Sequence, residues 1–302
     1  MIRTRSTWQR LATEAVNPRS RHIDTMAPED IVDMMILDNR AVLAAVQREK
    51  SRIARGAEIL ADAVLAGGRI IFAGAGTSGR LGVLEAAELP PTFGIEPATA
   101  RAIMAGGPAA VHRAKEGVED DDRAGRRAMR GVRPSRRDVV IGISASGVTP
   151  FVTGALVSAR AAKARVIAIT CAPRSELRNL ADVVIELVVG PEVIAGSTRL
   201  KAGTATKIAL NMLTTAAMVR AGKTYGNLMV DVKSNSDKLR DRARRITTSV
   251  TGVDEHAADA LLRRARWNVK AAILMQKTGA TRADALSRLR VEPRLRQLLG
   301  GR

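Results

Sequence analysis

Two short polar turns are the segments of this sequence best suited to bind an anion. Residues 74–79 read Gly-Ala-Gly-Thr-Ser-Gly and residues 144–150 read Ser-Ala-Ser-Gly-Val-Thr-Pro, and each turn follows an apolar run. Hydroxyls and free backbone N–H groups at the start of a helix bind phosphate without requiring a lysine. Each turn alone is also typical of a tight turn or a capped helix start. Because both turns end strands of one expected sheet, we interpret them as a phosphate site that contains Gly76, Thr77, Ser78, Ser144, Ser146, Gly147 and Thr149.

A third polar cluster opens the helix that we expect from residue 201. Residues 196–204 read Gly-Ser-Thr-Arg-Leu-Lys-Ala-Gly-Thr. Ser197, Thr198 and Lys201 could bind the same phosphate, because hydroxyls and an ammonium group all donate hydrogen bonds. A capped helix start explains these residues equally well, so both interpretations stay open.

Two glutamates could supply acid and base chemistry. Glu88 lies at the end of the helix expected after the first turn, just before Pro90 and Pro91, and Glu119 belongs to an acidic run over residues 119–122. A pair of positioned carboxyl groups can take a proton from a substrate and return one to a leaving group. Residue type and spacing by themselves favour plainer interpretations, namely a surface charge for Glu88 and a solvated helix start for the acidic run.

The remaining reactive residues indicate no other kind of site. His22, His112 and His256 are widely spaced, so neither a histidine metal site nor a Ser-His-Asp triad is indicated, and we expect no metal. Cys171 is the only cysteine, which rules out a disulfide within one chain and suits a reducing compartment. It lies in a strand-like run, where we expect a buried structural thiol.

Two observations bear on location. Residues 1–21 carry charges and no apolar stretch of the kind found in a signal peptide. No apolar run in the sequence reaches the length needed to cross a bilayer. We therefore expect a cytoplasmic protein with no membrane segment.

The formal net charge of +19 raises the question of nucleic-acid binding. Residues 238–302 contain 16 Lys or Arg and 6 Asp or Glu, so this segment alone supplies +10. Aromatic residues make up 2% of the chain, which leaves few side chains to stack on bases. We therefore favour a solvated basic surface over a nucleic-acid site. Its positive field would attract an anionic small molecule.

The elements that must position the candidate residues alternate between strands and helices. Helix-length segments separate four short apolar runs that read as buried strands, over residues 69–74, 138–144, 165–170 and 183–189. This alternation predicts an α/β fold with a right-handed parallel sheet covered by helices on both faces. A helical pattern precedes the sheet over residues 28–66, and three short helices over residues 245–292 are expected to form a small bundle after it.

Several motifs in register make the sequence similar to one family. Residues 74–94 read Gly-Ala-Gly-Thr-Ser-Gly-Arg-Leu-Gly-Val-Leu-Glu-Ala-Ala-Glu-Leu-Pro-Pro-Thr-Phe-Gly, which resembles the signature of N-acetylmuramic acid 6-phosphate etherases. Further segments similar to family motifs include Thr13-Glu14 with Asn17, Ile23-Asp24, residues 116–120, 144–150, 196–205 and 226–231, and Lys238-Leu239. The resemblance runs in order from about Thr13 to Leu289.

The resemblance implies a sugar isomerase (SIS) domain, a small C-terminal helical domain, a homodimer, and no metal or organic cofactor. It implies that Glu88 is the acid and Glu119 the base in a reaction that gives N-acetylglucosamine 6-phosphate and D-lactate. We accordingly expect residues 1–50 to form an N-terminal arm and helix, residues 51–236 the sugar-phosphate-binding α/β domain, and residues 237–302 the helical domain. Glu85 and Ser236 depart from the residues that the family pattern leads us to expect, which are Asp and Asn.

Other functions are possible on the same fold. A non-catalytic sugar-phosphate sensor similar to glucokinase regulatory protein would carry a second SIS domain, for which 302 residues leave no room. An aldose–ketose isomerase also needs a glutamate base at C2 but releases no lactate. A transcriptional regulator would need a helix-turn-helix ahead of the sheet, and the segment before Gly67 lacks its two short helices and basic recognition face.

Overall fold

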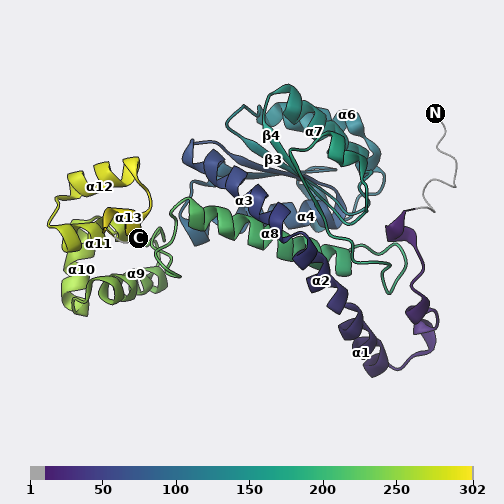
Figure 1. Cartoon of the computed structure of the whole chain (residues 1–302), viewed down its shortest axis with the longest axis horizontal. Helices are drawn as coiled ribbons and strands as arrows, with labels where there is room; N and C mark the ends of the chain where they lie inside the picture. Colours follow the sequence, from purple (N-terminus) through teal and green to yellow (C-terminus); the bar gives the residue numbers. More distant parts are fainter. Residues whose placement is uncertain (1–10, 301–302) are drawn as a thin grey trace. The chain divides into compact units, whose positions relative to one another are not determined.

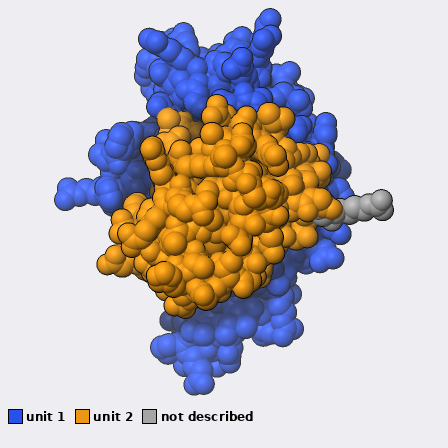
Figure 2. All heavy atoms as spheres, turned by 90° about the vertical axis from the view of Figure 1, so that its left-hand side faces the viewer, with its two compact units in different colours: residues 1–86, 100–214 blue, residues 87–99, 215–302 orange. Residues whose placement is uncertain are grey.

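A computed structural model of the chain describes residues 11–300, which divide into two units (Figure 2). Unit 1 comprises the described part of Met1–Ala86 together with Ala100–Thr214, and unit 2 comprises Ala87–Thr99 together with the described part of Thr215–Arg302. The domain boundaries expected after residues 50 and 236 stay predictions.

Unit 1 contains a five-stranded parallel sheet in the order β2-β1-β3-β4-β5. Its strands are β1 (Ile70–Gly74), β2 (Ala100–Met104), β3 (Val139–Ser144), β4 (Arg165–Thr170) and β5 (Val183–Glu186). Every residue of β1 and β3 is buried, as expected for central strands that are covered on both faces. The predicted parallel sheet is confirmed.

Helices cover both faces of this sheet (Figure 1). One face is covered by α6 (Asp122–Val132) and α7 (Pro150–Ala161), and the other by α3 (Lys50–Leu65), α4 (Gly76–Phe93) and α8 (Lys201–Arg220). Phe151 and Leu156 of α7 share a buried cluster with Ile71 and Val140 of the sheet. On the other face, α3 contacts β1, β3 and β5.

The strand β2 was not expected from the sequence. It reads Ala-Arg-Ala-Ile-Met, which lacks the Val and Ile run of the other strands. It lies at one edge of the sheet and pairs only with β1, and Arg101 within it is exposed. Pairing with β1 therefore makes this segment a strand, since its own β-propensity is low.

The helical pattern over residues 28–66 is interrupted twice. It forms α1 (Pro28–Asp38), α2 (Arg40–Arg48) and α3, with breaks at Asn39 and Glu49. The Asn39 side chain donates a 2.8 Å hydrogen bond to the Met35 carbonyl, an interaction that competes with the regular helix. The last helix ends before Gly67, at the predicted position, where a φ of 72° suits glycine.

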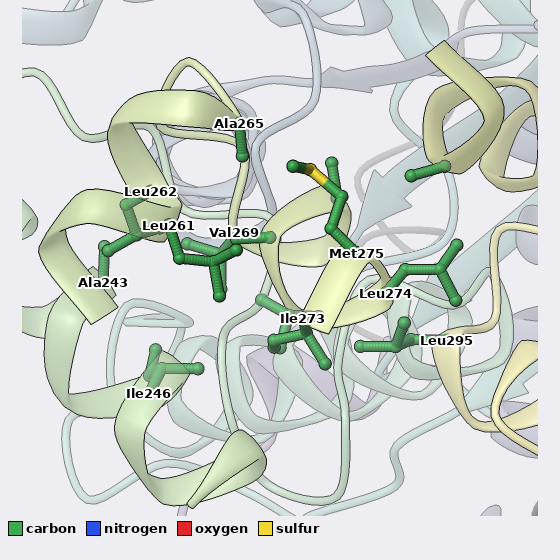
Figure 3. Packing of buried hydrophobic residues seen from close by; sticks show 14 of the residues in the cluster. Ala243, Ile246, Leu261, Leu262, Ala265, Val269, Ile273, Leu274, Met275 and Leu295 are labelled. Carbon is green, nitrogen blue, oxygen red and sulfur yellow. The ribbon is translucent and has the colours of Figure 1, made fainter. Parts of the chain in front are cut away.

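Unit 2 has a helical core of its own (Figure 3). Its helices are α9 (Asp237–Thr251), α10 (Glu255–Arg264), α11 (Val269–Thr278), α12 (Arg282–Val291) and α13 (Leu295–Leu298). The helix α11 is buried from Val269 to Met275, so the other helices pack around it. The three short helices expected from the sequence are confirmed as α10, α11 and α12, with Asp254, Asn268 and Thr281 as their N-caps. No helix in residues 11–300 is long and apolar enough to cross a membrane.

Candidate functional site

The strands β1 and β3 end at a cavity of about 260 Å³ in unit 1. Five segments of the chain line it, and they lie within residues 13–14, 75–80, 104–119, 145–149 and 196–198. Ligands in open parallel sheets bind at this end of the strands, where helices begin. The two polar turns singled out in the sequence therefore meet at one place.

The first turn presents the start of α4 to the cavity. Gly76, Thr77 and Ser78 all line it. The Gly79 N–H donates to the Ala75 carbonyl at 3.1 Å, so the helix ladder begins there. The N–H groups just before it belong to the helix end, where no intrahelical carbonyl is available. Together with the positive end of the helix dipole they favour an anion.

The second turn separates residues that face the cavity from residues that shape the turn. Ser146 and Thr149 line the cavity. Ser144 is 1% exposed, and its hydroxyl lies 2.7 Å from the Thr149 hydroxyl and accepts a 3.0 Å hydrogen bond from the Gly147 N–H. Gly147 has a φ of 73°, a conformation that favours glycine. Ser144 and Gly147 therefore hold Ser146 and Thr149 in place.

The third cluster is divided in the same way. Thr198 lines the cavity, whereas Ser197 and Lys201 do not. The start of α8 is capped by the buried Glu192 carboxylate, which accepts the backbone N–H groups of Lys201 and Ala202 at 3.0 and 2.9 Å. The start of α8 is therefore capped, but by Glu192 and not by a residue of the cluster, and phosphate binding by the cluster stays a prediction.

The Lys201 ammonium has protein partners. It lies 2.6 Å from Asp38 Oδ2 and donates a 2.8 Å hydrogen bond to the Pro191 carbonyl. Both Lys201 and Asp38 are buried. This ion pair ties α1 to the start of α8.

The structure brings one of the two glutamates to the cavity. Glu119 lines it, from a short 3₁₀ turn (Val118–Asp120) that follows Gly117. Glu88 is exposed on α4, in the segment that belongs to unit 2, and is not among the lining residues. In a single chain, the two polar turns and Glu119 therefore line one cavity, and Glu88 does not line it.

Two cationic side chains in the cavity wall were not assigned from the sequence. The Arg80 guanidinium donates to the carbonyls of Val111 and Ala110 at 2.8 and 2.9 Å, and the Lys115 ammonium donates to the Gly106 carbonyl at 3.1 Å. Neither forms an ion pair with a residue of the described chain. They place two positive charges in a lining that also contains Glu14, Glu116 and Glu119, so an anionic ligand has cations to bind on one part of the wall.

The two departures from the family pattern have structural partners. Glu85 is buried, and its carboxylate accepts hydrogen bonds from Thr214 at 2.5 Å and Asn211 at 2.9 Å. Ser236 caps α9, accepting a 3.4 Å bond from the Leu239 N–H. Neither residue lines the cavity.

Cys171 is confirmed as a buried thiol. Burial raises its pKa to about 12, and its sulfur lies 3.7 Å from the Ala202 carbonyl oxygen. Among residues 11–300, no three His, Cys, Asp or Glu side chains are grouped so as to hold a metal ion.

Comparisons with known proteins agree with this architecture. A model described as the glucokinase regulatory protein N-terminal SIS domain matches residues 52–160, and one described as the SIS domain matches residues 133–216. The second match confirms the predicted fold class.

The chain is similar to several curated proteins over most of its length. It is 49% identical over 265 residues to N-acetylmuramic acid 6-phosphate etherase of Gloeobacter violaceus, covering 88% of this chain and 87% of that one. It is 51% identical over 268 residues to the protein of the same name from Salinibacter ruber, covering 88% and 86%. A solved structure of phosphoheptose isomerase from Neisseria gonorrhoeae is 19% identical, with a TM-score of 0.48 over 63% of this chain and 97% of that one.

Proposed function

Because the chain belongs to the N-acetylmuramic acid 6-phosphate etherase family, as its motifs predicted, we propose that it cleaves the lactyl ether of N-acetylmuramic acid 6-phosphate. The products are N-acetylglucosamine 6-phosphate and D-lactate, so the enzyme is a carbon–oxygen lyase. The observation that carries the proposal is that the chain is 49–51% identical to curated etherases over 88% of its length. The cavity at the ends of β1 and β3 supplies a matching site.

The substrate phosphate is proposed to bind at the start of α4. Unpaired N–H groups of the first helical turn and the hydroxyls of Thr77 and Ser78 donate to its oxygens. Ser146 and Thr149 add hydroxyls from the second turn. The positive end of the helix dipole, with Arg80 and Lys115 in the same wall, favours the charged form of the phosphate.

Glu119 is proposed as the base of the elimination. In the open-chain sugar the C1 aldehyde acidifies the C2 proton, and the Glu119 carboxylate takes it. The electron pair of the C2–H bond forms a C2=C3 double bond as the C3–O bond breaks, and the departing lactate oxygen receives a proton from Glu88. Water then adds across the double bond, with its hydroxyl at C3 and a proton at C2. Both carboxyl groups return to their starting states.

The position of Glu88 supports a dimeric enzyme. Ser78 and Glu88 are ten residues apart in the single helix α4, which is about 15 Å along the axis. A hexose phosphate held at Ser78 is much shorter than this. We propose that a second copy of the chain supplies Glu88 to each cavity, in a homodimer with its active sites near the subunit interface. Such an interface could bury apolar side chains that are exposed on α1 and α2 of the single chain, namely Val32, Ile36, Leu37 and Leu43.

Lactate release tests the reaction directly. Purified protein given N-acetylmuramic acid 6-phosphate should release D-lactate, detected with a coupled D-lactate dehydrogenase assay. A sugar-phosphate sensor would bind the compound without turnover, and an aldose–ketose isomerase would give no lactate. Folded protein that releases no lactate would contradict the proposal.

Solvent exchange separates the roles of the two glutamates. Glu119→Gln should abolish both exchange of the C2 proton with deuterated solvent and lactate release. Glu88→Gln should retain some exchange, while turnover falls by about 10²–10⁴. Asp120→Asn, an exposed neighbour of Glu119 outside the cavity lining, is the control. Exchange lost in Glu88→Gln and kept in Glu119→Gln would reverse the assignment.

Mixing the two inactive variants tests the shared site. In a mixed dimer, one cavity would combine an intact Glu119 from one chain with an intact Glu88 from the other, so activity should reappear. Dimers that show no recovery after subunit exchange, or a protein that sediments only as a monomer at micromolar concentration, would contradict this arrangement.

We also propose a cytoplasmic location, supported by the buried Cys171 thiol.

A further inference from the structure

The segment Thr13–Glu14 of the N-terminal arm reaches the cavity, although neither residue has a part in the mechanism above. Thr13 belongs to a short 3₁₀ turn (Ala12–Glu14) and is 6% exposed. Its hydroxyl oxygen is buried and has no hydrogen-bond partner within the described chain. A buried hydroxyl without a hydrogen-bond partner destabilises the folded protein. A ligand in the cavity would remove this destabilisation by bonding to the hydroxyl.

Glu14, which is exposed, places a carboxylate in the same wall. Within residues 11–300 its carboxylate has neither a hydrogen bond nor an ion pair. The arm approaches the loop before α8 closely here, since a Cβ on Gly196 would lie 2.9 Å from Glu14 Oε2. Gly196 has a φ of 78° and also lines the cavity.

Asn17 fixes the arm at this place. Its amide donates a 3.3 Å hydrogen bond to the Pro191 carbonyl, and its side-chain oxygen accepts a 3.0 Å bond from the Arg19 N–H. Asn17 is itself buried. The two residues at the cavity are therefore part of a held structure, which lowers the entropy cost of using them to bind a ligand.

The chemistry of the two groups selects which part of a ligand they can bind. An ionised carboxylate only accepts hydrogen bonds, so Glu14 would repel a phosphate or a lactyl carboxylate. It suits neutral O–H and N–H donors. The Thr13 hydroxyl both donates and accepts, and can bond to a sugar hydroxyl. The phosphate turns lie elsewhere in the cavity lining, at residues 75–78 and 145–149.

We propose that Thr13 and Glu14 bind the neutral hydroxyl and amide groups of the sugar, while the two polar turns, at the start of α4 and after β3, bind its phosphate. The inference rests on the proposed function in one respect, namely that the ligand of this cavity is a sugar phosphate. It makes the arm a determinant of affinity for the sugar and not for the phosphate.

Binding of two probes tests this division. N-acetylglucosamine 6-phosphate and inorganic phosphate are titrated separately, by calorimetry, into the full chain and its variants. Thr13→Val removes the hydroxyl at nearly constant shape, and Glu14→Gln removes the negative charge. Each should weaken binding of the sugar phosphate about tenfold. Thr13→Val should leave the affinity for inorganic phosphate unchanged, and Glu14→Gln should not lower it, because a repelling charge is removed. Thr13→Ser, which keeps the hydroxyl, should bind the sugar phosphate like the unaltered protein.

The control is Thr25→Val, in the same arm. The Thr25 side chain is exposed, donates to the His22 carbonyl at 2.9 Å and does not line the cavity. It should leave both affinities unchanged.

Two results would overturn the inference. One is an unaltered affinity for the sugar phosphate in both Thr13→Val and Glu14→Gln. The other is an equal loss of affinity for both probes, which would mean that the arm acts by supporting the phosphate turns. Circular dichroism checks that each variant is folded, and if Thr13→Val is not, Glu14→Gln decides. A protein that binds the sugar phosphate but releases no lactate would contradict the proposed function and leave this test intact.

Discussion

Replacing Gly147 by alanine perturbs the second phosphate turn at the residue that shapes it. Gly147 has a φ of 73°, where an L side chain costs about 1–2 kcal/mol. The added Cβ would also lie 2.5 Å from Ser175 Oγ and 3.0 Å from Thr170 Oγ1. Ordinary contacts do not reach such distances, so Ser175 must move.

The cost of moving Ser175 follows from its hydrogen bonds. Its hydroxyl donates to the Gly147 carbonyl at 2.8 Å and accepts the Leu177 N–H at 3.2 Å, which caps a 3₁₀ turn (Glu176–Asn179). Losing both bonds costs about 2 kcal/mol, taking about 1 kcal/mol for each. With the backbone strain, Gly147→Ala should lower the free energy of unfolding by about 3–4 kcal/mol.

Gly190 provides a matched control. Its φ is 78°, and nothing lies within 4 Å of a Cβ built on it. Gly190→Ala should therefore show only the backbone strain of about 1–2 kcal/mol. The difference between the two variants isolates the crowding at Ser175.

Urea unfolding followed by far-ultraviolet circular dichroism measures both variants. Tryptophan fluorescence is less suitable, because one of the two tryptophans, Trp267, lies in unit 2 and the other, Trp8, lies outside the described residues, whereas Gly147 lies in unit 1. Gly147→Ala should also weaken phosphate binding, since it displaces Ser146 and Thr149. Equal destabilisation by the two substitutions would refute the reasoning, because it would mean that the turn accommodates a methyl group without moving Ser175.

Two further predictions concern buried charges. Lys201→Met leaves the buried Asp38 carboxylate without its cation and should lower the free energy of unfolding in urea by about 3–5 kcal/mol. The folded variant should still bind inorganic phosphate. A variant of normal stability that no longer binds phosphate would contradict this and make Lys201 a phosphate ligand. Burial raises the pKa of Asp138, but hydrogen bonds from the Arg69 side chain and from the backbone N–H groups of Arg69 and Ser135 outweigh it and hold that pKa below its ordinary value of 3.8. The carboxylate therefore stabilises the fold above about pH 4, and this contribution is lost as the pH falls further. From pH 5 downward, the free energy of unfolding should therefore fall less steeply with pH in Asp138→Asn than in the unaltered protein.

Local patterns in the sequence determined much of the fold and part of the site. The apolar runs of β1, β3 and β4 stand out because strands buried on both faces need continuous Val and Ile. The edge strand β5 carries a shorter run of the same kind. The caps Asp254, Asn268 and Thr281 mark the starts of their helices because each side chain accepts the backbone N–H only three residues later. The two polar turns could be recognised in the same way, since each lies at a strand-to-helix junction, and their binding of phosphate stays a prediction.

Tertiary structure decided what depends on residues far apart in the chain. The edge strand β2 forms by pairing with β1, and Glu192 caps α8 from nine residues before its start. Thr13 and Glu14 reach a cavity whose other walls begin some sixty residues later, so no local pattern marks their position. Among the seven residues of the two turns that were predicted to bind phosphate, only packing distinguishes those that line the cavity from Ser144 and Gly147, which support them. The sequence records which groups are present, but the direction in which each one points is set by contacts that form only when distant segments pack together.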